Sequence, residues 1–203
     1  LAFYNEHYSA NLMTLVVLGR EPLDELQSMV EARFAAVADR AATEMTGVPS
    51  MFAPGTLPLE VRIRPEQQLR ELTLLFPLPS ARKHYAAKPL EYIGDLLGHE
   101  GAGSPLSVLK ARGWAESLSA GAGLDLYGED AFQLSLNLTE EGVAHYRDIV
   151  ALLFRAIDRL REGGVEEWRF REQAKLADLA FRFREKGSPT GAVIALSNAL
   201  QDY

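Results

Sequence analysis

The sequence predicts an α+β fold in which helices pack on a mostly antiparallel sheet. Residues 132–138 alternate strictly between apolar and polar side chains, which is typical of a half-buried strand. The segment that follows Thr139 instead carries apolar residues every three or four positions, as one face of an amphipathic helix does. Strands and helices also follow one another in runs, without the regular strand-helix alternation of a parallel sheet.

The N-terminal region is expected to contain two helices separated by a strand. Residues 1–10 resemble the end of a helix, and Leu12 to Leu18 form a nearly continuous apolar run, which predicts a strand buried on both faces. Glu21-Pro22 opens the next helix, since proline at an early helical position loses no hydrogen bond. Residues 41–58 are rich in Gly, Pro, Ser and Thr, and we place an interdomain linker at 46–58.

The remaining elements are predicted from caps, breakers and periodicity. A strand is expected at 69–76, ended by Pro77 and Pro79, and a second at 115–120. Helices are expected at 88–98, from the Ser104-Pro105 cap to Gly113, from the Thr139 cap to Gly163-Gly164, at 165–184 and at 192–203. Trp114 and Trp168 are interpreted as packing residues because of their large apolar area.

Composition excludes several classes of function. The net charge of −7 argues against a general nucleic-acid binder, and the short basic run 182–186 is interpreted as a solvated helix end. The chain has no cysteine, which excludes disulfides and thiolate metal sites but fits cytoplasm and periplasm equally well. No run of eighteen apolar residues exists, so no membrane partner is expected.

The turn that contains His99 and Glu100 carries residue types used in catalysis without the spacing that catalysis needs. A zinc peptidase helix requires H-x-x-E-H or H-E-x-x-H, whereas this pair runs into glycines and no second histidine follows. The glycines of 98–104 also fail as a phosphate loop, because Ser104 stands where the lysine is needed. A turn histidine beside a polar residue is the simpler interpretation, and no catalytic residue and no metal site are expected in this chain.

Motifs along almost the whole chain are similar to those of one enzyme family. They are His7 to Met13, Val17 to Glu21, Leu23-Asp24, Phe76 to Pro79, Gly94, Leu97 to Gly101, Ser104, Leu109-Lys110, Gly113-Trp114, Leu138 to Gly142, Glu167-Trp168 and Phe181 to Phe183. On these residues the chain resembles the insulinase/pitrilysin family of zinc metallopeptidases. Members of that family are built from four related α+β domains, and the first domain carries the zinc motif.

The resemblance implies how this chain is divided. Residues 1–45 correspond to the C-terminal part of the first, catalytic-type domain without its zinc motif, and residues 59–203 to an incomplete second, non-catalytic domain. The expected fold is therefore an insulinase-type α/β roll truncated at both ends. Zinc is expected in the longer parent protein, outside this chain, and the expected partners are peptide substrates and the remaining domains of the same chain.

The resemblance also implies a candidate substrate site. In the family, the second domain holds the N-terminus of a peptide, which adds as a strand to a sheet edge; the matching positions here are Gly98, Glu100, Leu118 and Ala120. Strand addition uses backbone hydrogen bonds, and a carboxylate such as Glu100 would attract an ammonium group. The family pattern often has a larger apolar residue at Pro105 and a glycine at Ala120. Simple packing of turn and strand is the alternative interpretation of these four positions.

The sequence is compatible with three functions. The leading interpretation is the non-catalytic portion of an insulinase-like zinc metalloendopeptidase, which forms chamber wall and exosite while the parent hydrolyses peptides. The alternatives are a catalytically inactive family paralogue, acting as a structural or partner-binding subunit, and a free-standing peptide-binding module. An H-x-x-E-H motif upstream of Leu1 would separate the first two.

Overall fold

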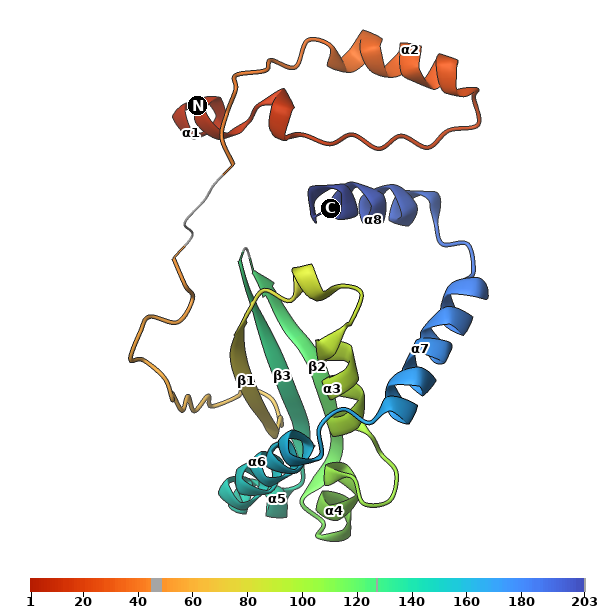
Figure 1. The fold of residues 1–203 in the computed structure, drawn as a ribbon. Helices are drawn as coiled ribbons and strands as arrows, with labels where there is room; N and C mark the ends of the chain where they lie inside the picture. Colours follow the sequence, from red (N-terminus) through yellow and green to blue (C-terminus); the bar gives the residue numbers. More distant parts are fainter. Residues whose placement is uncertain (45–48, 127, 203) are drawn as a thin grey trace. The chain divides into compact units, whose positions relative to one another are not determined.

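The computed structural model describes residues 1–44, 49–126 and 128–202, and it has the predicted α+β architecture (Figure 1). The chain divides into two compact units, Leu1–Val48 with Phe183–Tyr203, and Pro49–Arg182. Of the predicted linker 46–58, residues 46–48 lie outside the described residues, as do residues 45 and 203 of the predicted domains. No helix among the described residues combines the length and the hydropathy that crossing a bilayer requires.

The first unit is built from short helices. These are α1 (Ala2–His7), the 3₁₀ helix η1 (Ala10–Leu12), α2 (Leu23–Phe34) and α8 (Pro189–Asp202). The hydroxyl of Ser9, which is fully buried, accepts a 2.7 Å hydrogen bond from the backbone N–H of Arg40 and so joins the two ends of the N-terminal segment. The Gln201 amide donates a 3.1 Å hydrogen bond to the Thr14 hydroxyl, which ties α8 to the same unit.

The strand predicted at Leu12–Leu18 is not formed, so that prediction was wrong. The η1 turn ends at Leu12, and residues 13–19 have no regular secondary structure. Leu15 and Val17 are each about half exposed. A strand exists only through its hydrogen-bonded neighbour, and the described residues of this unit offer none.

The second unit is a three-stranded antiparallel sheet with helices. Its strands are β1 (Glu71–Pro79), β2 (Ala115–Leu126) and β3 (Glu129–Leu138). Its helices are the 3₁₀ turn η2 (Arg82–His84), α3 (Pro89–Gly98), α4 (Pro105–Ala111), α5 (Glu140–Ala144), α6 (Tyr146–Gly163) and α7 (Glu167–Arg182). Two predicted caps are confirmed: Ser104 Oγ accepts from the Ser107 N–H at 3.1 Å, and Thr139 Oγ1 from the Gly142 N–H at 2.9 Å.

The order of the strands is β1-β3-β2, so β3 is central and β2 lies at an edge. Leu134 of β3 is opposite Leu74 of β1 and Ala120 of β2, which puts apolar residues of all three strands on one face. The opposite face carries hydroxyls and amides, among them Thr73, Ser135 and Asn137. A sheet with one apolar and one polar face is expected for antiparallel strands, and it matches the alternation found in 132–138.

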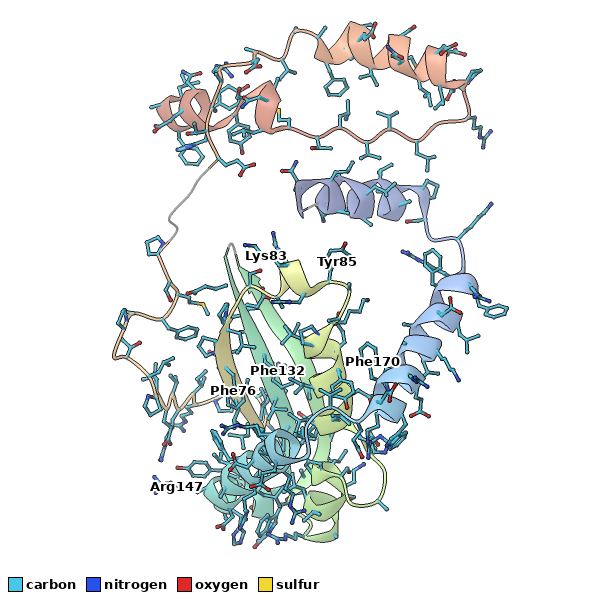
Figure 2. All side chains as sticks on the ribbon, viewed as in Figure 1. Phe76, Lys83, Tyr85, Phe132, Arg147 and Phe170 are labelled. Atoms are coloured by element: carbon cyan, nitrogen blue, oxygen red, sulfur yellow. The ribbon has the colours of Figure 1, made fainter. Side chains whose placement is uncertain are left out.

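The core lies between the apolar face of the sheet and helices α3, α4 and α6 (Figure 1). Leucines from each layer are fully or almost fully buried: Leu97, Leu106, Leu109, Leu134, Leu136 and Leu153. Phe76 and Phe132 are register partners on β1 and β3 (Figure 2). Phe76 also meets Phe154 of α6 edge-on, with 5.9 Å between ring centroids. The packing of the sheet against its helical layer therefore fixes the position of α3 relative to β2.

Both outer strands are longer than predicted. β1 runs through Pro77 to Pro79, whereas those prolines were expected to end it at residue 76. It tolerates them because it is an edge strand, where a missing N–H costs the sheet no internal bond. β2 continues past Ala120 to Leu126, with a register irregularity between Ala122 and Leu124. That irregularity surrounds Gly123, where an added Cβ would lie 2.7 Å from the Gln133 side chain.

The long helix predicted after Thr139 is interrupted. His145, at φ −105° and ψ 18°, separates α5 from α6, although α6 ends near Gly163-Gly164 as predicted. Trp114 is half-buried against the core, as expected, but Trp168 is 57% exposed, so its assignment as a packing residue was wrong within the described residues.

Candidate functional site

The outer edge of β2 has no strand beside it among the described residues, and α3 lies against the backbone of Ala120. Among the described residues β2 pairs only with β3, through the register that joins Leu118 to Leu136 and Ala120 to Leu134. In an antiparallel ladder alternate residues direct their N–H and C=O groups toward one neighbour, so the other residues of β2 direct theirs away from β3. Such an edge is a template for an extended peptide.

Helix α3 approaches β2 closely because two glycines face the strand. Gly94 is buried, and an added Cβ there would lie 2.9 Å from the Ala120 carbonyl oxygen. At Gly98, one turn later, an added Cβ would lie 3.4 Å from the Ala120 nitrogen. The two glycines therefore set the distance between helix and strand, and a larger residue at position 94 would push them apart.

An open groove of about 780 Å³ follows this helix-strand junction. One wall is α3 and the turn after it, the other is β2 from Leu118 to Ala122, and Gln173 of α7 contributes at one end. Three carboxylates line it, those of Glu91, Asp95 and Glu100, and its described lining includes neither lysine nor arginine. The groove is thus electrostatically suited to a cation beside a strand edge.

All four residues predicted for the substrate site line this groove. Gly98 closes α3, and Glu100 extends from the next turn with its side chain 71% exposed. The Leu118 side chain is only 6% exposed and belongs to the core, so Leu118 can offer a ligand only its backbone. Ala120 lies against Gly98. The Glu100 carboxylate is 3.7 Å from the Lys110 ammonium, a weak, exposed ion pair that a ligand could replace.

Sequence reasoning did not select Gly94, Glu91 and Asp95, which also line the groove. The signal was present, because Gly94 and Gly98 are four residues apart on the predicted helix, and so are Glu91 and Asp95. Positions four apart share one helical face. The two glycines on one face indicate that the helix approaches another backbone closely. The two carboxylates on the neighbouring face indicate that the contact is bordered by negative charge.

The described residues contain no group of three His, Cys, Asp or Glu side chains that could hold a metal ion. His99 is exposed, and its ring lies over Gly101, where an added Cβ would be closer to Nε2 than any real contact. The side chains described therefore do not fit a catalytic zinc site, which needs about three placed ligands.

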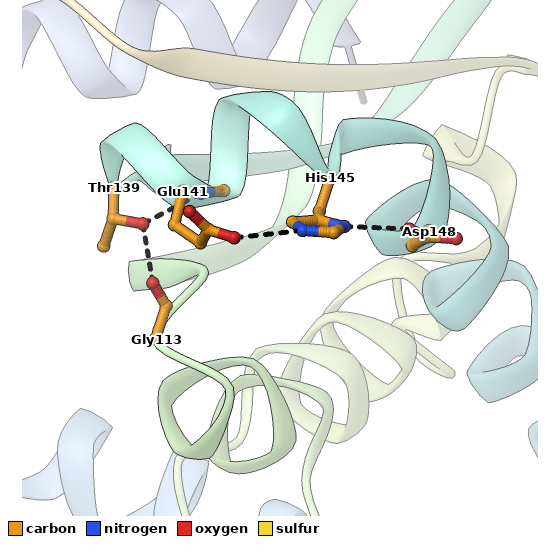
Figure 3. A network of polar contacts seen from close by, with 6 residues as sticks. Gly113, Thr139, Glu141, His145 and Asp148 are labelled. Atoms are coloured by element: carbon orange, nitrogen blue, oxygen red, sulfur yellow. Dashed lines mark hydrogen bonds and ion pairs between the residues drawn. The ribbon is translucent and has the colours of Figure 1, made fainter.

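A polar network lies at the start of α6, next to α5 and the end of α4 (Figure 3). His145 contacts Asp148 through Nδ1 and Glu141 through Nε2, both at 3.1 Å. Its ring stacks on Trp114 with 4.6 Å between centroids. Thr139 Oγ1 donates a 2.6 Å hydrogen bond to the Gly113 carbonyl oxygen. The network joins the end of α4 to the break between α5 and α6.

We expect this network to weaken as pH rises. The hydrogen bond to Asp148, and then that to Glu141, raise the pKa of His145 above its usual value, against partial desolvation. The folded state therefore favours protonated His145, and the resulting stability is fully present below the unfolded pKa of about 6.5 and is lost as pH rises through the higher folded pKa. Urea unfolding at a series of pH values from 5 to 8 measures this loss, and Asp148→Asn should reduce it; an unchanged profile in that variant would remove Asp148 from the role.

Comparison with known proteins identifies the family. Residues 1–176 match the family model described as Peptidase M16 inactive domain. The chain belongs to the peptidase M16 inactive-domain family. The M16 domain is 36% identical over 204 residues to the A-factor-processing enzyme of Saccharomyces cerevisiae, and 37% identical over 203 residues to the insulin-degrading enzyme of Homo sapiens. Both alignments cover 100% of this chain and 20% of the relative.

The fold of the M16 domain also has a close counterpart among solved structures. The crystal structure of pitrilysin superposes with a TM-score of 0.84 at 24% identity, over 99% of this chain and 22% of that chain. The insulinase/pitrilysin resemblance and the α+β fold are thereby confirmed, and the matching model is the family's inactive domain. The chain spans about a fifth of the length of the curated relatives it matches.

Proposed function

We propose that this chain is the non-catalytic portion of an insulinase-like zinc metalloendopeptidase, and that it holds the N-terminal segment of peptide substrates by strand addition to β2. The observation that carries the proposal is the open β2 edge bordered by an acidic groove. A peptide bound there would be anchored by its backbone, which allows many sequences. Anchoring also positions a bond elsewhere in the peptide for attack.

Under this proposal the chain has three parts. Residues 1–45 are the tail of a first, catalytic-type domain, 46–58 are a linker, and 59–203 are part of a second domain that forms chamber wall. The zinc ion, which would activate the hydrolytic water, is held outside this chain by the longer parent protein. The exosite is formed by four residues. Gly98, Leu118 and Ala120 contribute backbone contacts, and Glu100 contributes its charge.

Glu100 provides the first test. We expect Glu100→Gln to weaken binding of a peptide with a free N-terminus by about twofold to fivefold, since exposed ion pairs contribute less than about 1 kcal/mol. The same peptide with an acetylated N-terminus should lose little, because it carries no ammonium. The measurement is equilibrium binding of peptides labelled at the C-terminus to the intact protein, with any hydrolysis blocked by a chelator.

The matched control is Glu116→Gln, which removes an exposed carboxylate from β2 outside the groove lining. It should leave both affinities unchanged. Equal losses for free and acetylated peptides in Glu100→Gln would exclude Glu100 as the ammonium site. The experiment applies equally if the parent is a catalytically inactive paralogue, which the absence of H-x-x-E-H from the rest of the native protein would reveal.

A further inference from the structure

A second cleft lies between the helices of the same unit, separate from the acidic groove. Its volume is about 540 Å³, and it is bordered by the 99–105 turn, α4, α6 and the start of α7. His99 is the one described residue that lines both hollows. The floor is apolar and half-buried, formed by Leu96, Pro105, Val108, Leu152, Ala156 and Leu160.

Four arginines and a single glutamate surround this apolar floor: Arg112, Arg155, Arg159, Arg169 and Glu166. The Arg169 guanidinium is 2.5 Å from the Glu166 carboxylate, so that pair is neutral as a unit. Arg112 lies over the Trp114 ring at 4.8 Å, and no described carboxylate forms an ion pair with it. The cleft therefore carries three excess positive charges in a chain whose net charge is −7.

Arg155 and Arg159 are the two arginines of the cleft that favour an anionic ligand most strongly. They are four residues apart on α6, so their side chains are neighbours on one helical face, and like charges at this spacing repel each other. Neither forms a hydrogen bond or an ion pair with any residue that the structure describes. Arg161 on the same helix, by contrast, is paired with Asp158 at 3.4 Å. Of these three arginines, the one outside the cleft lining is paired with a carboxylate, and the two that line the cleft are not.

We propose that this cleft binds a small amphipathic anion, a carboxylate or a phosphate group carried on an apolar body. The guanidinium forks of Arg155 and Arg159 present paired donors that match either group. The apolar body would cover the half-exposed floor, and the volume lies in the range of small-ligand sites. This site is independent of the peptide groove and of the function proposed for it.

The test is calorimetric titration of the intact protein with four probes: 4-phenylbutyrate, phenyl phosphate, the neutral 4-phenylbutanol and inorganic phosphate. We expect the two organic acids to bind, and the double variant Arg155→Gln/Arg159→Gln to weaken the tighter one by about tenfold or more. Arg161→Gln removes the same charge from the same helix outside the cleft and should bind as the native protein does.

Three results would overturn the proposal. Equal affinities in the native protein and the double variant would place any bound acid elsewhere. Equal binding of 4-phenylbutanol would show that the arginines contribute nothing, and equal binding of inorganic phosphate would show that the apolar floor contributes nothing. Because both substitutions are at exposed positions of α6, a misfolded variant is not expected, and an unchanged circular dichroism spectrum checks this.

Discussion

Replacing Gly142 with alanine is expected to destabilise the protein by about 3 kcal/mol or more, toward the upper end of overpacking effects. An added Cβ would meet the carbonyl carbon of Trp114 at 2.8 Å and its carbonyl oxygen closer still. These are backbone atoms, so no rotamer change relieves the clash. The same carbonyl accepts a 3.1 Å hydrogen bond from the Thr139 N–H, which the shift would strain. Urea unfolding followed by tryptophan fluorescence measures the change.

Gly163→Ala is the matched control, since Gly163 also lies in a helix. An alanine Cβ there meets no described atom within 4 Å. Its effect should be neutral or stabilising by about 0.4–1 kcal/mol, because alanine restricts the unfolded chain. Similar unfolding midpoints for Gly142→Ala and the native protein would mean that α5 moves away from Trp114 without cost, contrary to the packing described.

The second large effect is expected on peptide binding. If a peptide adds to β2 as a strand, then alternate peptide N–H groups donate to β2 and the others face away. Methylating one backbone nitrogen at a time should therefore weaken binding at every second position. Each methyl group that blocks a bonded N–H leaves a strand acceptor unpaired and should cost about 1–3 kcal/mol, or about fivefold to 150-fold in affinity.

The control for this scan replaces the same peptide positions one at a time with alanine, which changes side chains and leaves the backbone donors intact. It should not reproduce the two-residue period of the methylation scan. A methylation profile that is flat, or that has one isolated sensitive position, would exclude strand addition at β2 while leaving a side-chain binding mode in the groove.

Local sequence patterns correctly predicted those elements whose formation depends only on residues close together in the sequence. The alternation of 132–138 identified β3, and Ser104 and Thr139 were correctly assigned as caps because capping needs only the next three residues. The sequence could not show that β1 lies at an edge, where Pro77 is tolerated. It also could not show that residues 12–18 lack a partner strand among the described residues. Both facts depend on which segments meet in space.

The break at His145 and the candidate site depend on the same kind of long-range information. His145 leaves the helical conformation where it stacks on Trp114, a residue thirty-one positions earlier. The four exosite positions came from family resemblance, and their role stays a prediction. The three carboxylates of the groove lie on α3 and on the turn after it, and the strand edge beside them belongs to β2. They border one groove only because the fold brings these elements together.

The two borders of the sheet are not equivalent. Two of the nine residues of β1 are prolines, which have no N–H to offer a neighbour, whereas β2 has no proline. Growth of the sheet is therefore hindered on one side and permitted on the other. An added strand would therefore pair with β2 and not with β1. Two copies of the chain that pair through β2 would compete with any peptide for the same edge. Self-association at high concentration is thus the expected by-product of keeping this border open.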